Sequence, residues 1–199
     1  MRLHENYLVA GVDEVGRGCL AGDVLAAAVI LHPKKPIDGL SDSKAINAIQ
    51  RSFVYEEIIQ NCICYSIRRA SVDEIDRFNI LQATLLAMKR AVDSLVIKPH
   101  RVMVDGNAIP RWEYESEAVI KGDSKVPEIS AASIIAKVTR DEEMNVLAKK
   151  YPGYGFSKNK GYGTPQHKAA IKAKGVCDCH RKTFSPMSEL INNRQECLL

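Results

Sequence analysis

Three short apolar runs in this chain each end in a carboxylate. Asp13 and Glu14 follow "LVAGV", Asp105 follows "RVMV", and Asp123 follows "AVIKG". An aspartate at the end of a single strand is usually an ordinary loop residue or a helix cap. Three such ends in one chain instead favour strands that lie side by side and bring their acids to one edge of a sheet.

Hydrophobic periodicity predicts the elements around these runs. Strands are predicted at residues 7–12, 24–31, 62–67, 100–105 and 117–123, and helices begin near residues 46, 79, 128, 164 and 185. Two early strands, then strands alternating with helices, indicate an α/β fold: a mixed central sheet flanked by helices on both faces. Ligands of such sheets bind outside the carboxyl ends of the strands, which is where the acids lie.

Local signals define several of the helices. The first carries Ile46, Ile49 and Phe53 on one face. "SVDE" at residues 71–74 has the spacing of a capping box, and the helix over 79–95 has a core stripe made of Leu81, Leu85, Met88, Val92 and Leu95. The helix over 128–150 opens with small residues, "ISAAS", which permit close approach to a neighbouring backbone. Thr-Pro at 164–165 and Ser-Pro at 185–186 begin the last two helices.

Carboxylates that converge need a compensating charge. Two of them ~4 Å apart repel by about 4 kcal/mol at an effective dielectric near 20. All-oxygen ligands suit Mg²⁺ or Mn²⁺ rather than zinc. Neighbouring residues of a regular strand point to opposite faces, so we expect the strand to end at Asp13 and Glu14. Gly16 and Gly18 then supply the backbone freedom for a bend.

The glycines of "GVDEVGRG" do not form a nucleotide-binding loop of a known type. Counted from Gly11, the segment has the four-residue gap of a P-loop but lacks the Lys-Ser/Thr that follows it, and from Gly16 it lacks the dinucleotide fingerprint. Acids within the loop would also repel phosphate unless a metal intervened.

Positive charge is concentrated near the C-terminal end. From Lys149 to Lys182, nine Lys and Arg residues less one acid, Asp178, give +8, so the rest of the chain carries −4 of the net +4. Such a run is often only a solvated face. Here Tyr151, Tyr154, Phe156 and Tyr162 are interleaved with lysines, a pattern that favours nucleic acid because lysines attract phosphate and rings stack on sugars and bases.

The sequence predicts a cytoplasmic protein without a membrane segment. Its longest apolar run has eight residues, "VLAAAVIL", against the ~20 that a membrane helix needs, and no secretory signal precedes the first acids. We expect the cysteines to be free thiols. Cys62 and Cys64, like Cys177 and Cys179 before His180, have one residue between them, whereas zinc sites usually have two to four.

Several motifs together resemble bacterial ribonuclease HII, the type 2 ribonucleases H. The matching segments, which occur in the order of the family, are "DEVGRG" (13–18), "DSK" (42–44), "VDGN" (104–107), "KGDSKVPEISAASIIAKVTRD" (121–141), "YGFSKNKGYGT" (154–164) and "HRKTFSP" (180–186). They span nearly the whole chain. Cys19 replaces the usual proline of the family, and Ala45 replaces an expected lysine.

The resemblance implies a ribonuclease H-like fold with a C-terminal helical extension, in a single domain over residues 1–199. Its catalytic core would cover about 1–150, and its basic loop and C-terminal helices about 151–199. The implied activity is an endonuclease that hydrolyses the RNA strand of RNA/DNA hybrids and cuts 5′ of single ribonucleotides embedded in duplex DNA. The products would carry 3′-hydroxyl and 5′-phosphate ends, and the role would be ribonucleotide removal from DNA by a monomer.

The resemblance also implies roles for particular residues. Asp13, Glu14, Asp105 and Asp123 would be the catalytic acids and would bind two Mg²⁺ or Mn²⁺ ions. The substrate-binding residues would be a loop that senses the 2′-hydroxyl, a tyrosine that stacks on the following sugar, and lysines that contact phosphate: Gly16, Arg17, Gly18, Tyr162, Lys44, Lys121 and Lys160.

Other residues stay open at this point. The three lysines could equally be solvated surface residues. Asp141 could assist the site or form a structural ion pair. His167 and His180 are expected to be structural or to contact backbone, since neither has a nucleophile as partner.

Two competing functions follow from the same residues. A nuclease of the same fold that acts on branched DNA would share the acids and the basic surface, but it would not need the loop for the 2′-hydroxyl. A non-catalytic module that binds RNA/DNA hybrids would use the basic segment alone and would not need the four acids.

Overall fold

A five-stranded mixed sheet forms the centre of the protein. The computed structural model describes residues 7–40 and 47–196. The strands are β1 (Val9–Val15), β2 (Val24–Ile30), β3 (Cys64–Ala70), β4 (Arg101–Asp105) and β5 (Glu115–Val119), in the spatial order β3-β2-β1-β4-β5. β2 is antiparallel to both β1 and β3, whereas β4 is parallel to both β1 and β5. The sheet is therefore mixed, as predicted.

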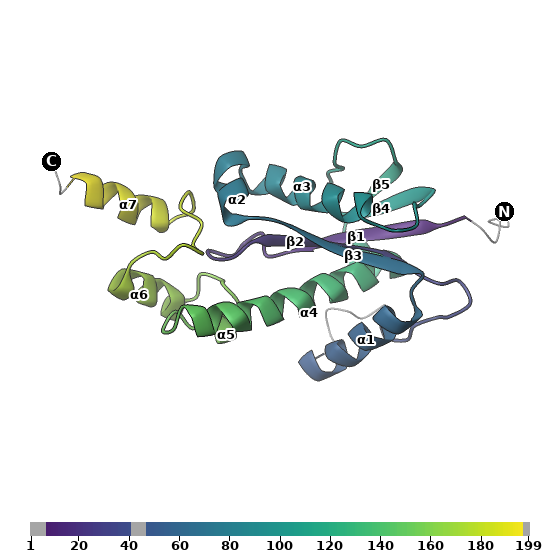
Figure 1. Cartoon of the computed structure of the whole chain (residues 1–199), viewed down its shortest axis with the longest axis horizontal. Helices are drawn as coiled ribbons and strands as arrows, with labels where there is room; N and C mark the ends of the chain where they lie inside the picture. Colours follow the sequence, from purple (N-terminus) through teal and green to yellow (C-terminus); the bar gives the residue numbers. More distant parts are fainter. Residues whose placement is uncertain (1–6, 41–46, 197–199) are drawn as a thin grey trace.

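Helices cover both faces of the sheet (Figure 1). On one face lie α2 (Val72–Phe78) and α3 (Ile80–Asp93), and on the other lie α1 (Ala48–Asn61) and the long α4 (Pro127–Lys150). β2 is buried along its whole length, with Ala26 and Ala28 in the core on the α3 side and Ala27 and Val29 in the core on the α4 side. The small side chains let both helices pack close to the centre of the sheet.

One glycine brings α4 directly onto β1. A Cβ atom at Gly11 would overlap the main-chain atoms of Glu128 in the first turn of α4. Any other residue at this position would push the helix away from the strand. Close approach of a helix backbone was predicted from the small residues of "ISAAS", and Ala131 and Ala132 are fully buried there.

The prediction of which face of the first helix is buried is wrong. α1 is a helix and begins with a capping box between Asn47 and Gln50. However, Ile49 and Phe53 are 84% and 69% exposed, and Val54 and Ile58 are the buried residues. α1 packs on α4 at the outside of the molecule, so only one narrow stripe of it is covered. Ile46 lies outside the described residues.

The other local signals match the structure closely. Ser71 and Glu74 form the predicted capping box of α2. The stripe of α3 lies in the core apart from Leu81, which is 42% exposed in the first turn. The predicted last strand is shorter than expected and lies at the edge of the sheet, so β5 is only partly buried.

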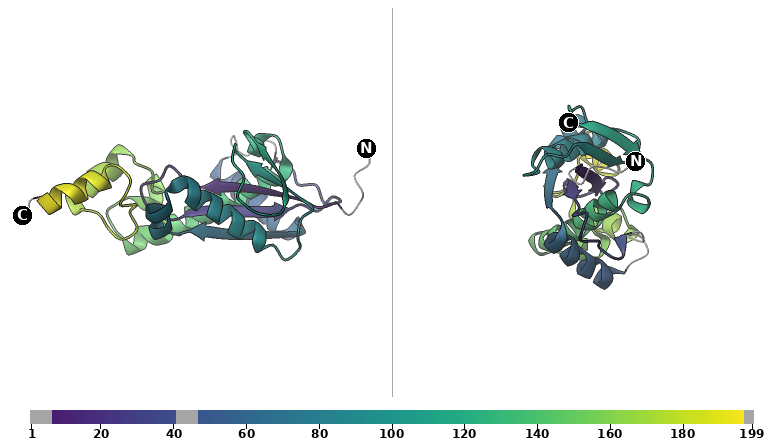
Figure 2. Two further views of the ribbon diagram at one scale, coloured as in Figure 1. Left: turned by 90° about the horizontal axis from the view of Figure 1, so that it is seen from above. Right: turned by 90° about the vertical axis from the view of Figure 1, so that its right-hand side faces the viewer.

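The C-terminal part of the chain lies beyond one end of the sheet (Figures 1 and 2). It contains α5 (Phe156–Asn159), α6 (Pro165–Lys174) and α7 (Met187–Glu196). Thr164 caps the start of α6 as predicted, and Gly175 caps its end. A core of its own joins these helices to Leu20 after β1 and to Met144 on α4. Within the described residues, no helix has the length and apolar character to cross a membrane.

Candidate active site

The acids of β1 and β4 meet because these two strands are parallel neighbours. The last pair of the β1–β4 ladder is Val12 with Val104. Asp13 and Asp105 come next in each strand, so both project from the same edge of the sheet. Glu14 follows Asp13, and one carboxylate oxygen of each of the three acids lies within 4.8 Å of the others.

The structure corrects the expectation that the strand ends at these acids. β1 continues to Val15, and its ladder with β2 runs as far as the pair Val15–Leu25. What ends at Val12 is the pairing with β4. This leaves space beside β1 in which Asp13 and Glu14 can both turn toward Asp105, although they are neighbours in one strand.

Asp123 lies next to this group but not within it. It belongs to a single 3-10 turn, η2 (Gly122–Ser124), which follows β5, and it is 4% exposed. Asp123 and Glu14 line the same cavity, of about 250 Å³. The Gly122 N–H donates a hydrogen bond of 2.6 Å to Asp105 Oδ1, which connects the turn to the other acids.

The cluster carries excess negative charge. Burial, and then the charge of Glu14, hold the pKa of Asp13 well above its ordinary value; the Ser133 hydroxyl opposes the shift, and Asp105 adds to it. Burial also raises the pKa of Glu14, against the opposing effect of the Arg17 guanidinium 3.3 Å away. A buried all-oxygen donor set of this kind fits a hard divalent cation, which would supply the missing positive charge.

The predicted substrate-binding loop and tyrosine lie side by side. Gly16 has a φ of 95°, which turns the chain after β1 and which other residues adopt rarely. Arg17 and Gly18 are exposed, and Cys19 forms an isolated β-bridge with Tyr162. Tyr162 is 45% exposed, and its ring would lie 3.9 Å from a Cβ atom on Gly18. An aromatic ring is therefore presented next to the bend.

Sequence reasoning missed two buried arginines that hold this loop. The Arg181 guanidinium donates to the carbonyl oxygens of Gly16 at 2.6 Å, Arg17 at 2.8 Å and Gly22 at 2.9 Å. Arg140 on α4 donates to the carbonyl oxygens of Ala21 and Asp23, at 2.9 and 2.7 Å. Both residues lie in the motifs "HRKTFSP" and "TRD", but no local pattern tells that their partners are main-chain oxygens far away in the sequence.

The other predicted residues fall into three groups. Lys44 lies outside the described residues. Lys121 is exposed, whereas the Lys160 ammonium donates to Asn145 Oδ1 at 2.7 Å and to the Asp141 carbonyl oxygen at 3.1 Å. Asp141 forms an ion pair of 2.6 Å with Lys137, one turn earlier on α4. In this conformation Asp141 and Lys160 therefore stabilise the protein's own helices.

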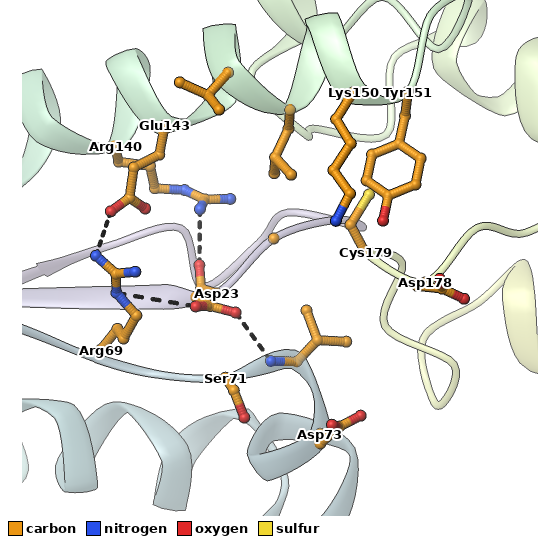
Figure 3. A pocket seen from close by; sticks show the side chains of 14 residues that line it. Asp23, Arg69, Ser71, Asp73, Arg140, Glu143, Lys150, Tyr151, Asp178 and Cys179 are labelled. Carbon is orange, nitrogen blue, oxygen red and sulfur yellow. Dashed lines mark hydrogen bonds and ion pairs between the residues drawn. The ribbon is translucent and has the colours of Figure 1, made fainter.

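A larger cavity, of about 470 Å³, is lined by Asp23, Arg69 and Arg140 among others, and none of the predicted site residues lines it (Figure 3). Its wall is a network of charges: Arg69 bonds to Glu143 at 2.6 Å and lies 4.0 Å from Asp23, whose carboxylate also accepts from the Val72 N–H at 3.1 Å. These contacts join β3, α2 and α4. The network supports the arginines that hold the loop.

Comparisons with known proteins agree on one family. The family model described as Ribonuclease HII matches residues 10–187. Ribonuclease HII of Delftia acidovorans is 56% identical over 95% of this chain and 80% of its own length, and that of Coxiella burnetii is 54% identical over 93% and 92%.

Solved structures give the same answer for the fold. The ribonuclease H2 of Pyrococcus horikoshii superposes with a TM-score of 0.79 at 30% identity, over 95% of this chain and 99% of that one. Bst-RNase HIII in complex with Mn²⁺ superposes with a TM-score of 0.72 at 19% identity, over 96% of this chain and 71% of that one. The second likeness is one of fold alone.

Proposed function

Because the chain belongs to the ribonuclease HII family, and is therefore a metal-dependent type 2 ribonuclease H, we propose that it cuts duplex DNA 5′ of a single embedded ribonucleotide as well as the RNA strand of RNA/DNA hybrids. The products would carry 3′-hydroxyl and 5′-phosphate ends. The observation that carries this proposal is the position of the acid cluster next to the bend at Gly16: Asp13 and Glu14 come just before the bend, and Tyr162 lies beside it.

Asp13, Glu14, Asp105 and Asp123 would hold two divalent cations, Mg²⁺ or Mn²⁺. When bound, these ions would supply an activated water and would stabilise charge on the leaving 3′-oxygen. The buried position of Asp13 and Asp123 limits solvent around the ligands, and the Gly122 N–H orients the Asp105 carboxylate. The protein's main contribution is to keep these oxygens in place while the scissile phosphate changes its geometry.

Recognition of the ribonucleotide would fall to the loop. The 2′-hydroxyl is the group that distinguishes RNA from DNA at one nucleotide, and it both donates and accepts hydrogen bonds. Gly16 and Gly18 carry no side chain, so a sugar can approach the main chain of the loop closely, and Arg17 places an exposed guanidinium between them. The Tyr162 ring would then stack on the next sugar.

Lysines would bind the flanking phosphates, Lys121 at the acids and Lys160 and Lys44 further along the duplex. Lys160 would have to leave Asn145 to do so. Binding should weaken as salt rises, because phosphate contacts release counterions.

The same proposal covers the whole chain. Residues 1–199 would form one domain, in which the basic segment after residue 150 extends the binding surface of the catalytic core. The shared packing of Leu20, Met144 and Phe156 supports this view. The enzyme would act as a cytoplasmic monomer in the removal of ribonucleotides from DNA.

Cleavage of defined duplexes tests the proposal. A labelled DNA duplex with one ribonucleotide, an all-DNA duplex and a continuous hybrid are incubated with the protein and Mg²⁺ or Mn²⁺. The variant is Asp105→Asn, which keeps an oxygen that can accept from Gly122, and the matched control is Asp73→Asn, an exposed acid on α2.

We expect one cut, 5′ of the ribonucleotide, retained in Asp73→Asn and reduced by at least about 100-fold in Asp105→Asn. Equal cutting of the all-DNA duplex would favour the nuclease for branched DNA. Binding of the hybrid without any cleavage would favour the non-catalytic module.

A further inference from the structure

A second group of metal-ligating atoms lies in the turn between α6 and α7, apart from the carboxylates. Cys177 Sγ lies 3.4 Å from Cys179 Sγ and 3.0 Å from His180 Nδ1, and all three atoms lie within 4.8 Å of one another. The His180 N–H donates to the Cys177 carbonyl oxygen at 2.9 Å and closes a four-residue turn. This turn brings the side chains of Cys177, Cys179 and His180 close together.

A chain of hydrogen bonds directs a lone pair of His180 toward the sulfurs. The Tyr162 carbonyl oxygen can only accept, so His167 Nδ1, 2.9 Å away, carries the proton. His167 Nε2 then accepts from His180 Nε2, at 3.1 Å, and this leaves the lone pair of His180 on Nδ1. Both rings are fully buried, so this chain of hydrogen bonds lies within the protein core.

The lone pair on His180 Nδ1 has one other neighbour. The Cys177 main-chain N–H lies 3.1 Å from it and donates to it in this conformation. A cation would take the place of that hydrogen bond. Cys177 is only half-buried and lines a cavity of about 340 Å³, so solvent reaches this residue.

We propose that Cys177, Cys179 and His180 bind one thiophilic divalent cation of the zinc type, at a structural site separate from the catalytic acids. Two sulfurs and an imidazole nitrogen suit zinc, whereas the carboxylates suit a hard cation. Around tetrahedral zinc, with bonds of about 2.3 Å to sulfur and 2.0 Å to nitrogen, such ligand atoms lie roughly 3.5 to 3.8 Å apart. The distances from Cys177 Sγ to Cys179 Sγ and to His180 Nδ1 would open by roughly half an ångström or less, and Cys179 Sγ and His180 Nδ1 already lie within 4.8 Å of each other. Water from the cavity would complete the coordination.

This proposal revises the expectation that these cysteines are merely free thiols. That expectation rested on the single residue between them. The tight turn compensates for the short spacing, because it adds the imidazole directly after the second cysteine. Cys62 and Cys64 have the same spacing, but no third ligand joins them in the described part of the chain.

The position of the site indicates what a cation would do there. The Cys179 carbonyl oxygen accepts from the Gly22 N–H at 2.8 Å, and Arg181, the next residue after His180, holds the carbonyl oxygens of the Gly16–Arg17 loop. A cation would therefore fasten the turn that carries this arginine. Its effect should be on stability and on the order of the loop rather than on the chemical step.

Zinc binding by the full-length protein tests the proposal directly. The protein is treated with chelator, kept reduced with a phosphine, supplied with excess Mg²⁺ and titrated with Zn²⁺, and bound zinc is measured after gel filtration. The test variant is Cys177→Ser/Cys179→Ser, and the matched control is Cys62→Ser/Cys64→Ser. Asp105→Asn serves as the control for the carboxylate site.

We expect one tightly bound zinc per chain in the wild type, in Cys62→Ser/Cys64→Ser and in Asp105→Asn. Affinity should fall by more than about 100-fold in Cys177→Ser/Cys179→Ser, beyond the effect of an outer-shell change. Co²⁺ should give a thiolate-to-metal absorption band in the wild type. This band decides the question even if the cysteine variant does not fold.

Three results would overturn the proposal. The first is zinc that is lost in Asp105→Asn but kept in Cys177→Ser/Cys179→Ser. The second is the absence of both tight zinc binding and the cobalt band in reduced wild-type protein. The third is an equal loss of zinc in the two cysteine variants.

Discussion

The Arg181 guanidinium donates hydrogen bonds to the carbonyl oxygens of Gly16 and Arg17, residues 165 and 164 positions earlier in the chain. Arg181 is fully buried, and its partners there are main-chain oxygens rather than an acid. Burial and the neighbouring Arg140 lower its pKa to about 10, so it stays charged at neutral pH. The C-terminal part of the chain thus holds the loop next to the clustered acids Asp13, Glu14 and Asp105.

Arg181→Lys should disturb the position of the Gly16–Gly18 loop more than the position of the clustered acids. Lysine carries three donors on one nitrogen and cannot reach the carbonyl oxygens that the planar guanidinium spans. We expect a loss of roughly 2 to 4 kcal/mol in the free energy of unfolding. Cleavage at a single ribonucleotide should fall more than cleavage of a continuous hybrid, since Arg181 acts by positioning the loop.

The control for this variant is Arg68→Lys, an exposed arginine on β3. Steady-state kinetics on both substrates, alongside chemical denaturation, make the comparison. An equal loss on both substrates would mean that Arg181 serves the fold in general and not the loop.

Asp13→Asn should stabilise the metal-free protein while it abolishes catalysis. The substitution removes one of three mutually repelling carboxylates and keeps an oxygen that accepts from the Glu14 N–H. We expect a gain of about 1 kcal/mol, or roughly 2 to 4 °C in Tm for a domain of this size. Thermal unfolding in chelator measures it, with Asp73→Asn as the control.

In the presence of Mg²⁺ the wild type should become more stable than Asp13→Asn, because the wild type gains metal-binding energy that the variant has lost. A metal-free Asp13→Asn protein less stable than the wild type would contradict the idea that the acids repel one another.

Glu74 should contribute stability that depends on pH. Its hydrogen bonds with Arg90 are the main reason why its pKa falls to about 2, and the two side chains are 27% and 40% exposed. A carboxyl with a lowered folded-state pKa stabilises the protein above its unfolded value, near 4.3, and loses this effect as pH falls toward 2.

Glu74→Gln should therefore cost about 0.5 to 1 kcal/mol at pH 7, a small value because solvent screens the pair. The difference from the wild type should shrink below pH 4. Urea unfolding across pH tests this, with the exposed Glu56→Gln as control. A difference that is constant with pH would assign the effect to the capping box alone.

Tyr162→Ala should weaken cleavage by roughly 5- to 100-fold, the range expected for the loss of one stacked ring. Tyr162→Phe keeps the ring and should stay close to the wild type. Tyr65→Ala, on the distant β3, removes a tyrosine of similar exposure and provides the control. If Tyr162→Phe is as impaired as Tyr162→Ala, the hydroxyl rather than the ring carries the role.

Local patterns predicted much of this fold. The capping box at Ser71, the Thr164-Pro165 start and the strand-end acids depend on neighbours in the chain, and each has its counterpart in the structure. The family and the ribonuclease H-like fold expected from the motifs are confirmed.

Features set by distant contacts could not be predicted. Which face of α1 is covered depends on where α4 lies, so Ile49 and Phe53 were placed wrongly. The extent of β1 depends on β2 continuing after β4 has ended. The role of Arg181 depends on carbonyl oxygens, which no sequence pattern records.

The contact between Gly11 and the backbone of α4 has a consequence for how sequences of this kind diverge. Main-chain atoms of Glu128 would touch a side chain at Gly11, and about three turns further along α4 Arg140 occupies the space beside Gly16 that a side chain there would need. The distance between α4 and β1 is thus determined by the contacts at Gly11 and Gly16 and not by the volume of the surrounding core. Core residues elsewhere can drift over evolutionary time, while Ser133 and Arg140 keep their distance from the acids, provided that both glycines are retained.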